Sequence, residues 1–476
     1  MRRTKIVSTI GPATRTPERI AEMIAAGMNV ARLNFSHGSQ AEHGANAEAV
    51  RAAARRAGVP VAILQDLQGP KMRTGPLASD EPVVLRPGDP LTITTLDVPG
   101  SRERISTDYA YLPGDVSPGD RILLSDGLIE LAVRETDDTE VRTEIIRGGS
   151  LRARQGINLP GINVSSPSVT EKDLCDLAFG ASLGVDYVAI SFVRRASDVQ
   201  TVRQALARAG SVTPVIAKLE RPEALDNLES ILAEADGLMV ARGDLGVEIA
   251  PERVPALQKE IIRAANRAGK PVITATQMLE SMIHAQQPTR AEVSDVANAI
   301  LDGSDAVMLS GETAIGEHPI AAIEMMARIA ESVEADAIRQ AEESVRYPLD
   351  QFSTIPQGIA AAVSALVRTL PLNAVCVVTR TGITARLVAR YRPHLPILAF
   401  TPLESTYRRL SLLWGVEPIQ TEYAHTEEGF FEQVRTLVLE RGYASSTDKV
   451  VITGGHPVTT GGPTNMIRVL SLDETL

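Results

Sequence analysis

Aromatic residues and cysteines are scarce in this sequence, and their scarcity excludes several classes of protein. Aromatic side chains make up 3% of the 476 residues, and Trp414 is the single tryptophan. Proteins that bind single-stranded nucleic acid stack bases on aromatic side chains, so this composition argues against that function. Two cysteines, Cys175 and Cys376, are too few for a disulfide framework and stand in no metal-ligand spacing. We expect both to be reduced thiols in the core.

An excess of positive charge and a long apolar segment are also missing. The net charge is −11, whereas a nucleic-acid or anionic-membrane partner calls for a basic face. No stretch approaches the roughly 20 apolar residues that cross a bilayer, and the N-terminal segment lacks the apolar region of a signal peptide. We therefore expect a cytoplasmic protein with no nucleic-acid or membrane partner. Local basic residues keep a phosphorylated small substrate compatible with the acidic composition.

Short β-branched segments alternate with amphipathic helical patterns along most of the chain. This alternation is the signature of parallel βα units, and eight such strands predict a (β/α)₈ TIM barrel within an α/β protein. A chain of this length has room for about two to four domains. The expected barrel strands cover residues 5–10, 29–35, 61–67, 186–192, 214–219, 237–241, 271–276 and 306–309.

Two regions depart from this pattern and predict further domains. Residues 70–168 contain short strands separated by Gly, Pro and Asp, which predicts an inserted all-β lid domain at the barrel mouth. Residues 336–476 contain a second βα series, which predicts a C-terminal α/β domain after a polar helix over 335–346. The catalytic barrel is then expected over residues 1–69 and 169–335.

Charged and hydroxyl side chains follow the predicted barrel strands. Catalytic residues of such barrels gather at the C-terminal ends of the strands, so we expect these side chains to share one mouth. The set comprises Arg32, Asn34, Ser36, Asp66, Lys218, Glu220, Arg242, Asp244, Thr276, Gln277, Ser310 and Glu312.

Two carboxylates in this set, Glu220 and Asp244, predict a divalent-metal site. Their hard oxygens suit Mg²⁺ or Mn²⁺, with water and substrate oxygens completing the coordination. Lys218 would point the same way as Glu220 along the strand and could stabilise a phosphoryl group in transfer. The Gly243 amide could bind a substrate carboxylate. Two alternatives stay open: the carboxylates could only pair with Lys218 or Arg242, and Gly243 could only make a tight turn.

Five segments of the sequence resemble the signatures of the pyruvate kinase family. Residues 29–38 read NVARLNFSHG, 239–248 read MVARGDLGVE, 273–282 read ITATQMLESM, 288–299 read PTRAEVSDVANA and 308–314 read MLSGETA. The predicted domain order also resembles that family, and the resemblance covers essentially the whole chain. It implies an Mg²⁺-dependent enzyme that transfers the phosphoryl group of phosphoenolpyruvate to ADP and yields pyruvate and ATP in the last step of glycolysis. It also implies a homotetramer with allosteric regulation.

The resemblance assigns a role to individual positions. Glu220 and Asp244 would hold Mg²⁺, Lys218 and Arg32 would contact the transferring phosphoryl group, and the Gly243 amide, Asp244 and Thr276 would bind phosphoenolpyruvate. Thr276 and Ser310 would lie near the enolate that must be protonated, although the proton donor is left open. The residues expected to face the nucleotide are Asn34, Phe35, Ser36, His37 and Arg73.

The sequence departs from the family pattern at two positions in the lid segments. Many relatives bind K⁺ through positions matching Asn34, Ser36, Asp66 and the Leu67 carbonyl, and carry Glu where this chain has Lys71. An ammonium there could replace K⁺, so we expect weak or absent K⁺ dependence; the alternative is a solvated Lys71 beside an intact cation site. Relatives also often carry Lys where this chain has Gln155, which leaves open whether Arg154 reaches the nucleotide instead.

A loop in the C-terminal domain has the residues of a phosphate cradle. It comprises Thr379, Arg380, Thr381, Gly382 and Thr384. Hydroxyls, a glycine and a helix N-terminus favour phosphate binding, and the family binds phosphorylated effectors in this region. An ordinary capped helix is the alternative.

Two other functions compete with phosphoryl transfer at this stage. A metal-dependent lyase could use the same enolate site for C–C bond chemistry, but it would need neither Arg73 nor Lys218 as a phosphoryl clamp. A catalytically silent regulatory protein could share the scaffold, but it would need none of Lys218, Glu220, Asp244 and Thr276.

Overall fold

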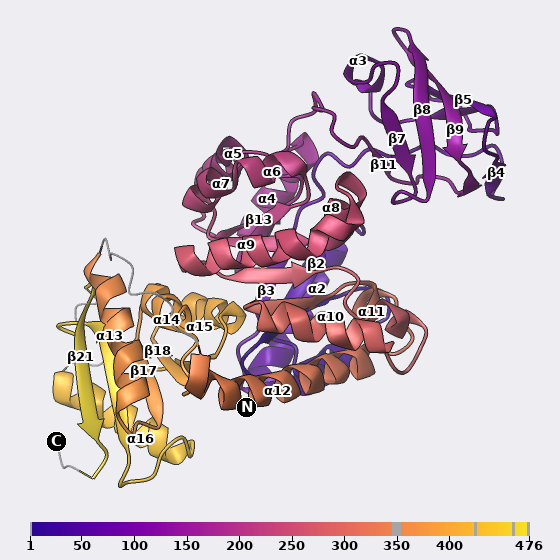
Figure 1. Ribbon diagram of the computed structural model, residues 1–476. Helices are drawn as coiled ribbons and strands as arrows, with labels where there is room; N and C mark the ends of the chain where they lie inside the picture. Colours follow the sequence, from indigo (N-terminus) through magenta and orange to yellow (C-terminus); the bar gives the residue numbers. More distant parts are fainter. Residues whose placement is uncertain (1, 345–353, 423–425, 459–461, 474–476) are drawn as a thin grey trace.

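The computed structural model describes residues 2–344, 354–422, 426–458 and 462–473, and the side chains of 337–344 are left aside. Eight parallel strands close into a barrel in the order β1-β16-β15-β14-β13-β12-β3-β2, which confirms the predicted TIM barrel (Figure 1). The strands are β1 (Lys5–Thr9), β2 (Val30–Asn34), β3 (Ala62–Asp66), β12 (Tyr187–Ile190), β13 (Val215–Leu219), β14 (Gly237–Ala241), β15 (Val272–Ala275) and β16 (Ala306–Leu309).

The barrel helices pack their apolar faces onto the outside of this barrel. Several begin at a hydroxyl N-cap, because the side-chain oxygen satisfies a free backbone N–H of the first turn: Ser39, Thr170 and Thr289 each form a capping box. The helices are α1 (Pro17–Ala26), α2 (Gln40–Ala57), α4 (Glu171–Leu183), α5 (Ala196–Arg208), α6 (Pro222–Asp226), α7 (Leu228–Glu234), α8 (Arg242–Glu248), α9 (Val254–Ala268), α10 (Arg290–Leu301), α11 (Gly311–Ala314) and α12 (Pro319–Ser344).

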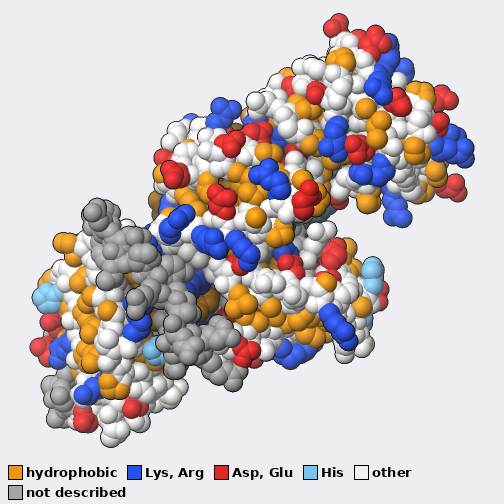
Figure 2. All heavy atoms as spheres, in the orientation of Figure 1, with side chains coloured by type: hydrophobic (Ala, Val, Ile, Leu, Met, Phe, Trp, Pro, Cys, Tyr) orange, Lys and Arg blue, Asp and Glu red, His pale blue; other side chains and the backbone are white. Residues whose placement is uncertain are grey.

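The inserted lid is an all-β domain with its own core, as the sequence predicts. Its six-stranded sheet runs β11-β7-β8-β9-β5-β6, and β10 pairs with β4 in a second small sheet. The lid stands clear of the barrel at the upper right of Figure 1, and Figure 2 shows acidic and basic side chains interspersed over it. Its elements are β4 (Val83–Leu85), β5 (Pro90–Thr94), β6 (Arg104–Ser106), α3 (Leu112–Asp115), β7 (Arg121–Leu124), β8 (Ile129–Thr136), β9 (Glu140–Arg147), β10 (Gly149–Leu151) and β11 (Ile157–Asn158).

The C-terminal domain is a five-stranded sheet in the order β19-β18-β17-β20-β21, parallel except for β21. The predicted separate helix over 335–346 is wrong in one respect: these residues begin inside the long helix α12, which runs from Pro319 across the predicted boundary at 335/336. The domain comprises α13 (Ile355–Thr369), β17 (Ala374–Val378), α14 (Ile383–Ala389), β18 (Ile397–Thr401), α15 (Glu404–Arg409), η3 (Leu410–Leu412), β19 (Val416–Gln420), α16 (Glu427–Glu440), β20 (Lys449–Gly455) and β21 (Thr464–Ser471).

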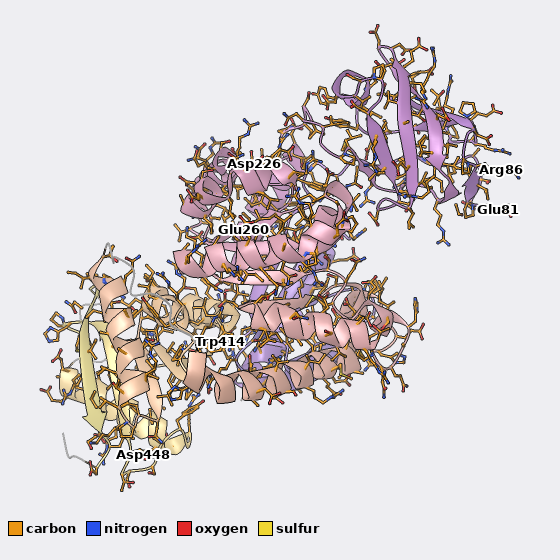
Figure 3. The ribbon with its side chains drawn as sticks, viewed as in Figure 1. Glu81, Arg86, Asp226, Glu260, Trp414 and Asp448 are labelled. Carbon is orange, nitrogen blue, oxygen red and sulfur yellow. The ribbon has the colours of Figure 1, made fainter. Side chains whose placement is uncertain are left out.

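The C-terminal domain closes the bottom of the barrel, opposite the mouth. Leu412 packs in the same cluster as the side chains of the barrel interior and is fully buried. Trp414, labelled in Figure 3 between the two domains, lies under the guanidinium groups of Arg3 and Arg392, at 5.4 and 4.7 Å from the ring centre. Arg408 pairs with Asp186 at 2.9 Å. Aromatic, apolar and ionic contacts therefore join the two domains.

The structure tests the prediction that both cysteines are core thiols. Cys376 is buried in the C-terminal sheet, but the prediction of a core thiol is wrong for Cys175, which is exposed on α4. The reason is that Cys175 lies on the solvent side of α4, whose buried residues are Asp173, Asp176, Leu177 and Gly180. None of the helices in the described segments combines the length and the apolar content that crossing a bilayer requires.

Candidate active site

Two cations and two carboxylates meet at the C-terminal ends of β2, β3 and β13. Asp66 receives Arg32 at 2.7 Å on one oxygen and Lys218 at 3.2 Å on the other. The Lys218 ammonium also lies 2.9 Å from Glu220. Lys218 therefore bridges two carboxylates: Asp66, which also pairs with Arg32, and Glu220, which is expected to bind the metal.

Burial and mutual charge set the protonation of this group. Burial opposes the charge on Lys218, but Asp66 and Glu220 outweigh it and raise the pKa of the ammonium. Burial also opposes the charge on Asp66, yet Lys218 and Arg32 lower the pKa of this carboxyl. Burial, joined by the negative charge of Asp244, raises the pKa of Glu220 against the effect of Lys218. Lys218 and Asp66 are thus charged, while the attraction of Lys218 only partly offsets the effects of burial and of Asp244 on Glu220.

Ser191 belongs to this site and was missed by the sequence analysis. Its hydroxyl accepts a hydrogen bond from the Lys218 ammonium at 2.8 Å and donates one to the Leu67 carbonyl at 2.7 Å. The next amide, from Phe192 in a left-handed conformation, donates to Glu220 at 2.7 Å. The available signal was its position directly after β12, where it belongs with the other strand-end residues.

Gly243, Asp244 and Thr276 come together at the ends of β14 and β15. The Gly243 amide donates to the Thr276 hydroxyl at 2.7 Å, and a Cβ added at Gly243 would lie 3.4 Å from that oxygen. Gly243 lies inside α8, so it does not form the tight turn considered as an alternative. Thr276 and Gln277 both have left-handed backbones, which strains a β-branched residue and is typical of functional sites.

The short helix α8, which carries Asp244, is held by an ion pair at each end. At its start Arg242 pairs with Asp295 at 2.7 Å and donates to the Thr276 carbonyl at 2.8 Å. At its end Glu248 pairs with Arg221 at 2.7 Å, and both side chains are almost completely buried. Arg242 therefore does not neutralise Asp244. Arg221, Glu248 and Asp295 were not predicted from the sequence.

The Arg221–Glu248 pair also reaches the lid. Arg221 donates to the carbonyl of Ile162, in the segment that returns from the lid, at 2.8 Å. Asn158 of β11 donates to Glu248 at 3.5 Å. Glu220 and Arg221 are neighbours, and Asp244 and Glu248 are one helical turn apart, so the pair links the two predicted metal carboxylates to the hinge of the lid.

These observations test whether a divalent metal fits the site. Glu220 and Asp244 are close enough for Asp244 to raise the pKa of Glu220, and a cation would relieve that repulsion. In the described segments no group of three or more His, Cys, Asp or Glu residues is arranged to hold a metal. Two carboxylates completed by water and substrate oxygens are the arrangement that Mg²⁺ prefers at phosphoryl-transfer sites. Glu220 and Asp244 therefore fit a bound Mg²⁺.

Residues 34–37, which are expected to face the nucleotide, already contact other groups of the protein. The Phe35 ring is 2% exposed and stacks on His43 at 4.1 Å. Its amide donates to the Asp66 carbonyl at 2.9 Å and its carbonyl accepts the Lys172 ammonium at 2.8 Å, so the polar groups of Phe35 already have partners. The Asn34 carboxamide accepts the Ser36 amide at 3.2 Å. The pKa of His37 is lowered by burial and by the positive charges of Arg73, Lys71 and Arg32, which keeps this imidazole neutral.

Lys71 lies between the lid and the predicted metal carboxylates. Its ammonium is 4.0 Å from Asp244, and its side chain is 30% exposed. Two of the oxygens considered for K⁺ already have partners, because Asp66 binds Arg32 and Lys218 and the Leu67 carbonyl accepts the Ser191 hydroxyl.

The lid residues and Ser310 complete the predicted set. Arg73 donates to the Arg154 carbonyl at 3.2 Å, and Gln155 donates its amide to Thr74 at 2.9 Å. The Ser310 amide donates to the buried Glu312 at 2.7 Å, which fixes the loop that presents the Ser310 hydroxyl.

The C-terminal phosphate loop is held by hydroxyl contacts. The Gly382 amide donates to the Thr379 hydroxyl at 2.9 Å, the Thr406 hydroxyl donates to the Arg380 carbonyl at 2.7 Å, and the hydroxyls of Thr384 and Thr464 are 2.6 Å apart. Thr381 lies exposed between them.

Barrel, lid and strand-end cluster together define an α/β-barrel enzyme with a carboxylate pair poised for a divalent cation beside a lysine. Two family descriptions match the sequence: "Pyruvate kinase, barrel domain" over residues 1–323 and "Pyruvate kinase, alpha/beta domain" over residues 357–470. The chain belongs to the pyruvate kinase family, and its enzymatic activity is that of this family.

Individual relatives agree with this assignment. The chain is 46% identical over 473 residues to "Pyruvate kinase 2" of Synechocystis sp., covering 98% of this chain and 79% of that protein. It is 45% identical over 472 residues to a pyruvate kinase of Staphylococcus epidermidis, covering 98% and 80%. Among solved structures, a pyruvate kinase from Cryptosporidium parvum superposes with a TM-score of 0.90 at 37% identity, over 99% of this chain and 96% of that one.

Proposed function

We propose that the barrel mouth transfers the phosphoryl group of phosphoenolpyruvate to ADP, with Mg²⁺ held by Glu220 and Asp244. The bridge from Asp66 through Lys218 to Glu220 carries this proposal, because it fixes an ammonium beside the carboxylate pair. When bound, Mg²⁺ would neutralise negative charge on the substrate oxygens. In the transfer the P–O bond to the enolate oxygen breaks and a P–O bond to the terminal phosphate of ADP forms.

Each residue of this chain has a defined task in that transfer. Lys218 and Arg32 stabilise negative charge on the phosphoryl group, and their orientation is set by Asp66. The Gly243 amide and Thr276 hydroxyl, now bonded to each other, turn to the substrate carboxylate. The product enolate takes its proton through a hydroxyl or water relay at Thr276 and Ser310, because an unperturbed hydroxyl is too weak an acid to donate directly.

We infer that Lys71 supplies the positive charge that relatives obtain from K⁺. Its ammonium lies at the metal carboxylates, and its charge lowers the pKa of His37, next to Ser36 of the expected cation site. Asn34, Ser36, His37 and Arg73 would then contact ADP under the closed lid. The loop of Thr379, Arg380, Thr381, Gly382 and Thr384 would bind a phosphorylated effector in a cytoplasmic homotetramer, in line with the family.

The test is a coupled assay of pyruvate formation from phosphoenolpyruvate, ADP and Mg²⁺. We expect turnover by the wild-type chain and a fall of at least about 100-fold in kcat for Lys218→Met, the order of magnitude lost with one preorganised electrostatic group. Lys449→Met, an exposed lysine of the C-terminal domain, is the control and should leave kcat unchanged. Absence of wild-type turnover would overturn the proposal, and near-normal turnover by Lys218→Met would remove Lys218 from its role.

A further inference from the structure

A small cavity between the barrel bottom and the C-terminal domain is lined by three cations. Lys270 follows the left-handed Gly269 that ends α9, whereas Arg386 lies on α14 and Arg390 directly after it. Asp305, which precedes β16, is the single acidic side chain of the lining. The lining therefore carries an excess of two positive charges within a chain whose net charge is −11.

The carboxylate of Asp305 is already engaged and does not neutralise these cations. It pairs with Arg392 at 3.2 Å and accepts the Val272 amide at 2.9 Å and the Trp414 amide at 3.4 Å. In the part of the chain that the structure describes, no acidic side chain forms an ion pair with Arg386 or Arg390. Asp236 and Glu234 act on Lys270 from outside the lining and offset part of the positive charge, but among the described residues neither pairs with Arg386 or Arg390.

One of these cations, Arg386, has unused hydrogen-bonding capacity. Its Nε is buried and has no hydrogen-bond partner among the described residues. The Lys270 ammonium, in contrast, donates to the carbonyls of Leu232, Ala233 and Ala235, and burial together with the charge of Arg386 lowers its pKa against the effect of Asp236 and Glu234. A buried N–H without an acceptor costs free energy, and an anion placed here would relieve both this cost and the repulsion between the cations.

We propose that this cavity is a phosphate-binding site, separate from the active site and from the loop at residues 379–384. Guanidinium groups bind phosphate through paired N–H donors, and Arg386 and Arg390 occupy adjacent turns that face the barrel. The cavity volume is about 10 Å³, close to that of one water molecule, so the two arginine side chains must rotate outward to admit the anion. A phosphate group fits this description, with any organic part of the ligand left in solvent.

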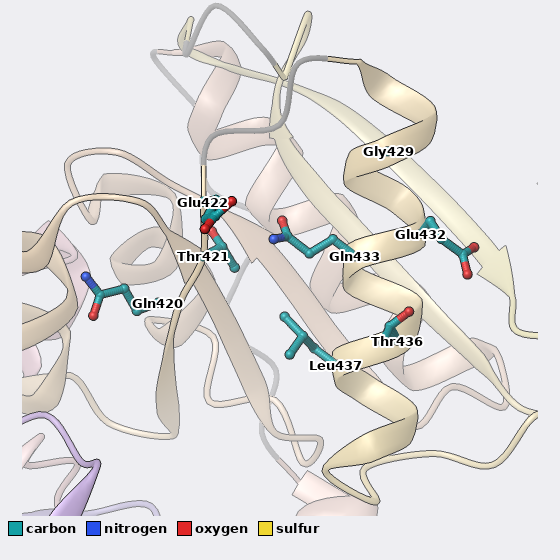
Figure 4. A pocket seen from close by; sticks show the side chains of 8 residues that line it. All are labelled: Gln420, Thr421, Glu422, Gly429, Glu432, Gln433, Thr436 and Leu437. Atoms are coloured by element: carbon teal, nitrogen blue, oxygen red, sulfur yellow. The ribbon is translucent and has the colours of Figure 1, made fainter. Parts of the chain in front are cut away.

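Binding here would join the two domains. Arg386 and Arg390 of the C-terminal domain would donate to the phosphate, and the positive charge of Lys270 on the barrel side would attract it. A separate and much larger pocket of the C-terminal domain has a different chemistry: its volume is about 740 Å³, and its described lining consists of Glu422, Glu432 and neutral side chains, without Lys or Arg (Figure 4). That acidic pocket would repel the same ligand.

Binding is measured by calorimetry on the full chain with inorganic phosphate, a sugar monophosphate and a nucleoside monophosphate, at an ionic strength held constant with NaCl. We expect at least one of the three to bind, and the double variant Arg386→Gln/Arg390→Gln to bind it at least about 10-fold more weakly. Arg368→Gln, an exposed arginine on α13, is the matched control. Equal affinity for all three ligands would support the site and indicate that the phosphate group alone is recognised. Preference for one of the two monoesters would also support the site and would identify the source of the phosphate.

A second readout locates the ligand. The bound anion should slow the acetylation of Lys270 in the wild type but not in the double variant. Mass spectrometry measures the extent of acetylation. The proposal is overturned if none of the ligands binds, or if binding survives in the double variant; its loss in Thr381→Val/Thr384→Val would then place the ligand at the loop of residues 379–384. These readouts do not require turnover, so they remain informative if the proposed reaction fails its own test.

Discussion

Single charges decide the chemistry of the barrel mouth. Asp66 has no substrate to bind when Arg32 and Lys218 occupy both of its oxygens, so its role is to position those two cations. Lys71 adds a further positive charge 4.0 Å from Asp244. At that separation two unit charges interact by about 4 kcal/mol at the effective dielectric typical of a protein surface. This partly exposed pair is screened by solvent, and less than that figure is expected in practice.

Lys71→Glu should make the enzyme depend on K⁺. The wild type is expected to turn over equally in KCl and in tetramethylammonium chloride, because the ammonium is part of the chain. The variant loses this charge, so we expect kcat to fall about 10-fold without K⁺, which is about 1.4 kcal/mol, and to recover in KCl. Steady-state kinetics in the two salts measure this, with the exposed Lys449→Glu as control. Strong activation of the wild type by KCl would contradict the inference.

Among the helices and strands, α8 carries two residues of the site and is held in place at both ends. Its first turn carries the Gly243 amide and Asp244, and ion pairs to α10 and to the end of β13 hold it at both ends. Buried ion pairs gain little stability after desolvation, and Nε of Arg221 and one oxygen of Glu248 have no hydrogen-bond partner among the described residues. Glu248 is therefore better explained as a positioning residue for Asp244 than as a source of stability.

Glu248→Gln is expected to weaken divalent-metal binding about 10-fold, the usual effect of losing a group that orients a ligand. The reason is that neutral Gln no longer holds Arg221, so the end of α8 is released. The dissociation constant for Mn²⁺, measured by electron paramagnetic resonance, reports this without turnover. The exposed Glu252→Gln is the control.

A double variant separates positioning from stability in the same experiment. Arg221→Gln/Glu248→Gln removes both buried charges, so its unfolding temperature should approach that of the wild type, while Mn²⁺ stays weakly bound. Wild-type Mn²⁺ affinity in Glu248→Gln would show that the pair is structural only.

For the whole molecule, the important junction is that between barrel bottom and C-terminal domain. Leu412 fills the barrel interior, and the ammonium of Lys5 donates to the Val416 carbonyl at 2.7 Å across the junction. Burial, together with the charge of Arg2, lowers the pKa of Lys5 to about 8. The unfolded chain therefore binds more protons than the folded one between about pH 8 and the ordinary lysine pKa of about 10.4.

Stability should consequently rise with pH through that window because of Lys5. From pH 7.5 to 9.5 its contribution to the free energy of unfolding is expected to increase by about 2 kcal/mol, while below pH 8 the contribution is flat. Lys5→Met should lose this slope, although it also lowers stability at every pH by leaving the Val416 carbonyl unpaired. Unfolding temperatures across this pH range measure the effect, with the exposed Lys449→Met as control. Identical pH slopes in wild type and Lys5→Met would contradict it.

The eight barrel strands could be predicted because parallel strands covered on both faces are apolar along their whole length. Strands β19 and β21 of the C-terminal sheet were not predicted. The edge strand β21 buries only two of its eight residues, so polar residues interrupt its apolar ones. The prediction gave only a polar helix beginning at residue 335, whereas α12 already begins at Pro319 and continues to Ser344.

The sequence by itself determined which chemical groups stand at the strand ends, because a strand-to-helix pattern locates each end along the chain. It also determined the family, through ungapped motifs. Only the tertiary structure decided which groups pair: Lys218 with Asp66, Glu220 and Ser191, and Arg221 with Glu248. Partners such as Arg221 and Glu248 are 27 residues apart in the chain and meet only when the barrel closes. Ionic interactions depend on separations of a few ångströms, and no pattern in the chain encodes such distances.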